Sequence, residues 1–220
     1  LVRDHLEIKP IAELPVTAAN CSFSQHENFW YILGGQQEVD SKTASNKCFR
    51  FDFDHPDLGW VELPRMPDSG RILAVSAANE DGLFVFSGAS LSDGKRTYLK
   101  SALKFDGKNW MQITECPQPI TAAANPGVEL EKGAFTFLSG DDGKLAESAL
   151  EDAHPGFSRC VFTYCVSSDR WLFSDVIPEE VQMDSKHKAV LIAPVTSTAV
   201  KWNGKIVIPG GEARPAVRTR

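Results

Sequence analysis

The apolar and polar positions of the chain follow a pattern that recurs four times. In each copy a short apolar run ends at a pair of small residues, at 30–35, 83–88, 135–140 and 206–211. The last glycines of these runs are 53, 52 and 71 residues apart, and polar insertions at about 141–158 and 179–193 account for the long final interval. Self-similarity at a period of about 50 residues predicts a repeat architecture.

Each copy contains further strand-like segments at matching positions. A small-residue segment precedes each glycine pair, at 17–23, 72–78, 120–128 and 195–202. Aromatic-rich segments follow at 48–53, 102–105 and 160–165, and Trp60, Trp110 and Trp171 each begin one more short apolar segment. Their β-branched and aromatic content and the turn residues between them indicate strands, and we find no convincing helix. Four strands per repeat predict an all-β fold, a β-propeller.

The repeats divide the chain into expected blades within a single domain, 1–220. We place complete blades at about 15–64, 65–117 and 118–178 and a partial blade at 190–220, with 1–14 as the last strand of a preceding blade. Such an arc would expose sheet faces and edges, so we expect self-association or a missing propeller segment. A closed four-blade ring is the less favoured alternative.

Composition excludes several classes of function. The net charge of −6 argues against nucleic acid or an anionic membrane as a partner, and no apolar run approaches the length needed to span a bilayer. The five cysteines are scattered and fit buried thiols, and the five histidines lack metal-ligand spacing. Nucleotide-binding and nucleophile-elbow motifs are absent, so we expect no cofactor and no metal. Because the chain begins at Leu1, a natural start is expected upstream, and a signal peptide there would imply a periplasmic or secreted protein.

The final apolar run leads into the most distinctive loop. Gly210 and Gly211 allow a sharp turn, Glu212 follows at once, and Pro215 stiffens the segment that ends in Arg218. A carboxylate and a guanidinium on one short loop suit a site that transfers a proton and binds an anion. A polar hairpin loop with a surface ion pair is the alternative.

These features resemble the cyclically permuted mutarotase family of kelch-repeat propellers, related to N-acetylneuraminate epimerase (sialic acid mutarotase). The resemblance lies in the segments 86–89, 139–143, 154–158 and 209–219, and the family's Glu, five intervening residues, then Arg fall on Glu212 and Arg218. It implies a kelch-type fragment of a six-bladed ring, with about three full blades and two partial ones. It also implies a cofactor-free isomerase for sialic acid or a related acidic sugar, with Glu212 as base and Arg218 as anion clamp. Ala216 departs from the glycine that the family commonly has there.

Up-and-down strands place the loops after the glycine pairs and the loops between blades on one face. That face collects Arg65, Asp142, Glu212 and Arg218, together with four candidate substrate contacts. These four are Arg71, Asp141, His154 and Arg214; for Arg71, Asp141 and His154 a structural role in holding a loop is the alternative. A non-catalytic kelch module that binds protein or glycan partners is the alternative function.

Overall fold

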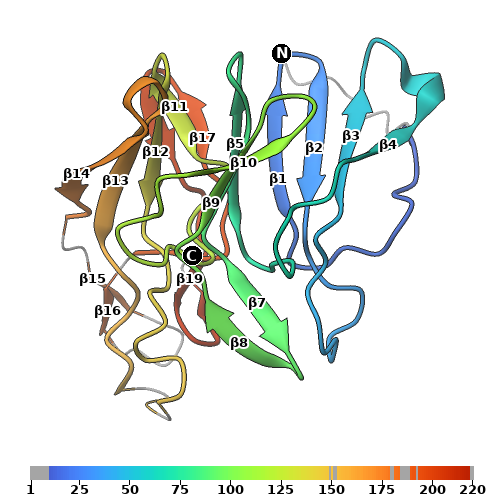
Figure 1. Ribbon diagram of the computed structural model, residues 1–220. Coiled ribbons are helices and arrows are strands. Elements are labelled where there is room, and N and C mark those ends of the chain that lie inside the picture. Colours follow the sequence, from blue (N-terminus) through green and yellow to red (C-terminus); the bar gives the residue numbers. More distant parts are fainter. Residues whose placement is uncertain are drawn as a thin grey trace, which may run out of the picture.

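The computed structural model describes residues 10–148, 150, 153–178, 181–183, 189–191 and 193–218. In these ranges the chain forms antiparallel strands, turns and short 3₁₀ segments, and no α-helix (Figure 1). The first sheet contains β1 (Ser22–His26), β2 (Phe29–Leu33), β3 (Cys48–Asp52) and β4 (Trp60–Leu63). The second contains β5 (Val75–Asn79), β6 (Gly82–Phe86), β9 (Ala102–Phe105) and β10 (Trp110–Ile113). The third contains β11 (Val128–Glu131), β12 (Ala134–Leu138), β13 (Cys160–Cys165) and β14 (Arg170–Val176).

The fourth copy of the pattern forms a two-stranded sheet, β17 (Val200–Trp202) and β18 (Lys205–Val207). Three additional hairpins are β7 (Ala89–Ser92) with β8 (Lys95–Tyr98), β15 (Val181–Met183) with β16 (Ala189–Leu191), and β19 (Glu212–Arg214) with β20 (Val217–Arg218). The predicted fold class is confirmed: the protein is all-β and built from four-stranded antiparallel sheets, as in a β-propeller.

The central sheet is buried on both faces, which explains the continuous apolar run in β6. Leu83 and Val85 pack against residues of the first sheet, whereas Phe84 and Phe86 pack against aromatic residues of the third. Successive side chains of a strand point to opposite faces, so one strand supplies both inter-sheet cores. The Phe86 ring lies 4.8 Å from that of Phe137.

The repeated tryptophans join neighbouring sheets. Trp110 Nε1 donates to the carbonyl of Pro64 at 2.7 Å, and Trp171 Nε1 donates to the carbonyl of Thr114 at 3.0 Å. Each bond connects the outermost strand of one sheet to the end of the outermost strand before it. The fixed spacing of these residues therefore serves the packing of the repeats.

A ladder of backbone hydrogen bonds links the same point of each repeat. The Leu73 N–H donates to the carbonyl of Asn20 at 2.8 Å, Ala122 to Leu73 at 2.8 Å, and Thr196 to Ala122 at 2.7 Å. All four residues have left-handed backbone, with φ values of 55°, 54°, 58° and 50° in chain order. We call Asn20, Leu73, Ala122 and Thr196 the left-handed ladder.

The ladder explains where the innermost strands depart from prediction. We expected strands at 17–23, 72–78, 120–128 and 195–202, but β1, β5, β11 and β17 begin at Ser22, Val75, Val128 and Val200. A left-handed residue cannot continue a strand, so each strand begins only after the ladder. We expected 1–14 to hold the last strand of a preceding blade; residues 1–9 lie outside the described part, and residues 10–14 form no strand.

The cysteines are all free thiols. Cys48 and Cys116 are buried, and burial raises the pKa of each to about 12. Cys21, Cys160 and Cys165 are only partly buried, so the prediction of buried thiols holds for two of the five.

Candidate functional site

The long loops and extra hairpins gather at one end of the sheets. In Figure 1 the hairpin β7–β8 and strands β15, β16 and β19 lie in the lower half, whereas the turns after β1, β5 and β11 lie at the top. This is the distribution that up-and-down strands predict, because alternate connections fall at opposite ends. The loop that carries Glu212 belongs to the lower end.

Equivalent bridges place four residues at the same point of successive repeats. In each repeat, the residue after the small-residue pair forms an isolated β-bridge with the residue that precedes the ladder residue of that repeat. The bridges are Ala19 with Gln36, Ile72 with Ala89, Thr121 with Asp141, and Val195 with Glu212. The two carboxylates among these positions, Asp141 and Glu212, therefore stand in adjacent repeats.

The hairpin β19–β20 brings the two residues of the sequence motif together. Glu212 pairs with Arg218 in the antiparallel register. The register shifts between Glu212 and Arg214, and the pairing places Glu212 and Arg218 opposite each other on the backbone of one hairpin. Glu212 is partly buried and Arg218 is exposed.

Both oxygens of the Glu212 carboxylate accept hydrogen bonds from the protein. The Ala216 N–H donates to Oε1 at 2.6 Å, and Thr196 Oγ1 donates to Oε2 at 3.2 Å. A carboxylate offers about four acceptor sites, so each oxygen can still accept a bond from a ligand. The side chain is thus oriented while it keeps the capacity to take up a proton.

The turn of this hairpin contains a strained alanine. Pro215 and Ala216 are its central residues, and Ala216 has φ 61°. A proline followed by positive φ is the geometry of a type II turn, whose third position favours glycine. The glycine that the resembled family has at this point would fit the observed backbone.

We expect Ala216→Gly to stabilise the protein by about 1 kcal/mol, because glycine adopts positive φ without the Cβ clash. Urea unfolding of the two proteins measures this difference. Ala18→Gly, at an ordinary backbone position, is the control and should not stabilise. A destabilised Ala216→Gly variant would contradict the strain.

Arg71 is buried and serves as a structural hub. Its side chain is fully buried; Nη1 donates to the carbonyls of Ser87 at 2.8 Å and Ser101 at 3.1 Å. Nη2 donates to Ser101 Oγ at 3.0 Å and forms an ion pair with Asp68. These contacts correspond to the structural role that we considered for Arg71, in which its guanidinium binds loop carbonyls at the lower end of the sheets.

Three further charged or polar residues expected on this face differ in exposure. Arg214 is buried, with 2% of its surface exposed, whereas Arg65 is exposed and reaches Glu62 at 3.4 Å. His154 Nδ1 accepts a bond from the Gly156 N–H at 3.1 Å, which holds its own loop.

Asp141 is anchored by a residue that the sequence did not reveal. Its Oδ2 accepts a bond from the Tyr98 hydroxyl at 2.7 Å, and its Oδ1 accepts one from the Gly143 N–H at 2.9 Å. Burial, with the hydrogen bond to Asp141, raises the pKa of Tyr98 to about 12. Tyr98 lies on β8 opposite Ala89, in a hairpin that follows its small-residue pair as β19–β20 follows Gly211. The two hairpins differ in length and sequence, so the repeat pattern gave no signal for Tyr98.

Thr196 was also missed, although the sequence contained a signal. Counting back 16 residues from Gly35, Gly88 and Gly211 reaches the residue just before a ladder position. Aligning the repeats on these three glycines makes Thr196 equivalent to Asn20 and Leu73, but this equivalence alone does not place it beside Glu212.

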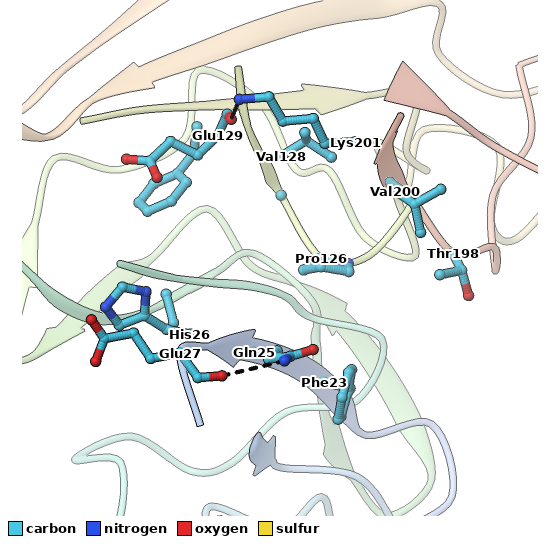
Figure 2. A pocket seen from close by; sticks show the side chains of 14 residues that line it. Phe23, Gln25, His26, Glu27, Pro126, Val128, Glu129, Thr198, Val200 and Lys201 are labelled. Carbon is cyan, nitrogen blue, oxygen red and sulfur yellow. Dashed lines mark hydrogen bonds between the residues drawn. The ribbon is translucent and has the colours of Figure 1, made fainter. Parts of the chain in front are cut away.

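A separate cleft of about 540 Å³ opens between the innermost strands. Phe23 of β1, Pro126 and Val200 of β17 give it apolar walls, and Lys201 at its edge donates to the carbonyl of Glu129 at 2.8 Å (Figure 2). None of the site residues predicted from the sequence lines this cleft. It includes the β1–β2 turn, at the end opposite Glu212.

Within the described ranges, no group of three or more His, Cys, Asp or Glu side chains is arranged to hold a metal ion. No helix in the described part of the chain is long and apolar enough to cross a membrane.

No family model matches the chain. Its fold is similar to the solved structure of YjhT, with a TM-score of 0.70 and 16% sequence identity. The similarity covers 95% of this chain and 62% of that one, so the chain spans less than two thirds of the YjhT structure. At this identity the likeness concerns the fold alone, which is that of a β-propeller.

Proposed function

We propose that this chain belongs to a cofactor-independent sugar mutarotase that interconverts the anomers of N-acetylneuraminate or a related acidic sugar. The observation that carries the proposal is the pairing of Glu212 with Arg218 across one hairpin, with the carboxylate oriented by Thr196 and Ala216. The β-propeller fold, which the chain shares with the solved structure of YjhT, supports the proposal, because the resembled mutarotase family has that fold.

The chemistry requires the sugar ring to open and close again. Glu212 removes the proton of the anomeric hydroxyl, the bond from the anomeric carbon to the ring oxygen breaks, and the ring oxygen is protonated by water or a second side chain. The resulting ketone rotates, and closure on its other face reverses these proton transfers. Arg218 binds the sugar carboxylate through its guanidinium fork, which fixes the reacting carbon near Glu212.

NMR of freshly dissolved N-acetylneuraminate tests the proposal. Catalytic amounts of the protein should accelerate the approach to anomeric equilibrium. Acceleration should be much weaker for N-acetylmannosamine, which has no carboxylate for Arg218 to bind. An equilibration rate equal to that in buffer would refute the mutarotase function.

A non-catalytic binding module is the second candidate, and the cleft between the innermost strands favours it. Phe23 and Val200, which line the cleft, leave 36% and 46% of their surface exposed. Exposed apolar side chains of this kind often mark an interaction surface. Binding of a glycan or a protein without any change in anomer equilibration would support this candidate.

A further inference from the structure

Thr196 has a backbone conformation that its residue type disfavours. Its φ of 50° lies in the left-handed region, where a β-branched residue is a rare outlier. The other ladder residues share the conformation, so the repeat architecture imposes it on this position. Unfavourable conformations of this kind are often retained at functional sites.

The contacts of Thr196 connect the ladder to the proposed base. Its N–H donates to the carbonyl of Ala122 at 2.7 Å, which fixes its backbone to the preceding repeat. Its hydroxyl donates to Glu212 Oε2 at 3.2 Å. The residue before it, Val195, exchanges two backbone hydrogen bonds of 2.9 Å with Glu212.

The other repeats show that the hydroxyl is dispensable for the ladder. The equivalent residues are Asn20, Leu73 and Ala122, and none has a hydroxyl. The hydroxyl is found in the repeat whose bridge position holds Glu212. Ala122 has φ 58° and completes the same hydrogen bonds, so alanine at this point is compatible with the fold.

We infer that Thr196 is a positioning residue, whose hydroxyl holds the Glu212 carboxylate in the orientation needed for proton transfer; this inference rests on the proposed mutarotase function. The Ala216 N–H anchors one carboxylate oxygen and Thr196 the other, so two points define the carboxylate plane. Without the hydroxyl, the carboxylate can rotate about its single remaining anchor. Proton transfer depends on this geometry, whereas sugar binding by Arg218 does not.

The test compares Thr196→Ala with Thr196→Ser, which restores the hydroxyl, and with Thr97→Ala as a control at an exposed position on β8. Thr196→Ala should lower kcat for anomer interconversion by about ten-fold or more with KM changed less than about two-fold. Thr196→Ser and Thr97→Ala should stay close to wild type, and the melting temperature of Thr196→Ala should not fall. A structural role alone would lower the melting temperature and leave kcat unchanged.

A second readout separates this inference from the proposed function. The carboxyl ¹³C resonance of Glu212 should move in Thr196→Ala and return to its wild-type position in Thr196→Ser. A wild-type protein without mutarotase activity would overturn the proposed function, and the resonance would still decide whether Thr196 orients the carboxylate. Wild-type kcat in Thr196→Ala, or an unmoved resonance, would overturn the positioning role.

Discussion

Glu212→Gln should reduce the mutarotase activity of the protein by about 10²–10⁴-fold, the usual contribution of a general acid–base residue. Glutamine keeps the size of the side chain and one carbonyl oxygen for the Ala216 N–H bond, but it cannot accept a proton from the anomeric hydroxyl. The hairpin should therefore remain folded while the chemical step is lost. Anomer equilibration of N-acetylneuraminate followed by NMR measures the rate, with KM for the sugar determined in parallel.

Glu131→Gln provides the matched control. Glu131 is an exposed glutamate at the end of β11, next to the β11–β12 turn at the opposite end of the sheets. The same chemical change there should leave the rate unaltered. Undiminished activity in Glu212→Gln would remove Glu212 from the mechanism.

Arg71→Met should destabilise the folded protein by about 3–5 kcal/mol, because it leaves buried acceptors without their donor. The carbonyls of Ser87 and Ser101 would each lose a hydrogen bond, and Asp68 would lose its ion pair. Methionine fills much of the same volume, so the loss reports on the polar contacts more than on a cavity. The free energy of unfolding in urea measures the effect.

Arg65→Met is the control for that experiment. The Arg65 side chain is 59% exposed and its ion pair with Glu62 is on the surface, so its removal should cost at most about 1 kcal/mol. Equal stability of the Arg71→Met and wild-type proteins would show that the buried guanidinium is not a structural hub.

The strands could be predicted from the sequence because the repeat supplied several copies of the same signal. The alternation of Leu83, Phe84, Val85 and Phe86 in one short run reflects a strand buried on both faces, and the repeated tryptophans mark the junctions between sheets. The pairs of small residues at the ends of the apolar runs, each of which ends in glycine, gave the length of the repeat. The sequence also placed Glu212 and Arg218 on one short segment, whereas the hairpin that pairs them depends on the positive φ of Ala216, which alanine does not indicate.

The remaining features depend on interactions between repeats, which a single copy of the pattern does not contain. The left-handed ladder shortens the innermost strands, and nothing in Leu73 or Ala122 announces positive φ. The β7–β8 hairpin shares its place after a small-residue pair with β19–β20 but differs from it in length and sequence, so Tyr98 and its bond to Asp141 had no periodic signal. The sequence leaves open whether Arg71 contacts a ligand or loop carbonyls. The packing of the loops that contain Ser87 and Ser101 decides this in favour of the carbonyls.

The most direct test of the account is a ¹⁵N NMR titration of the protein with N-acetylneuraminate. If the site lies on the β19–β20 hairpin, the amide signals of Thr196, Glu212 and Arg218 should shift in a saturable manner, and those of Phe23 and Lys201 in the distant cleft should not. Saturable shifts confined to the cleft, or no shifts at all, would contradict the assignment of the site.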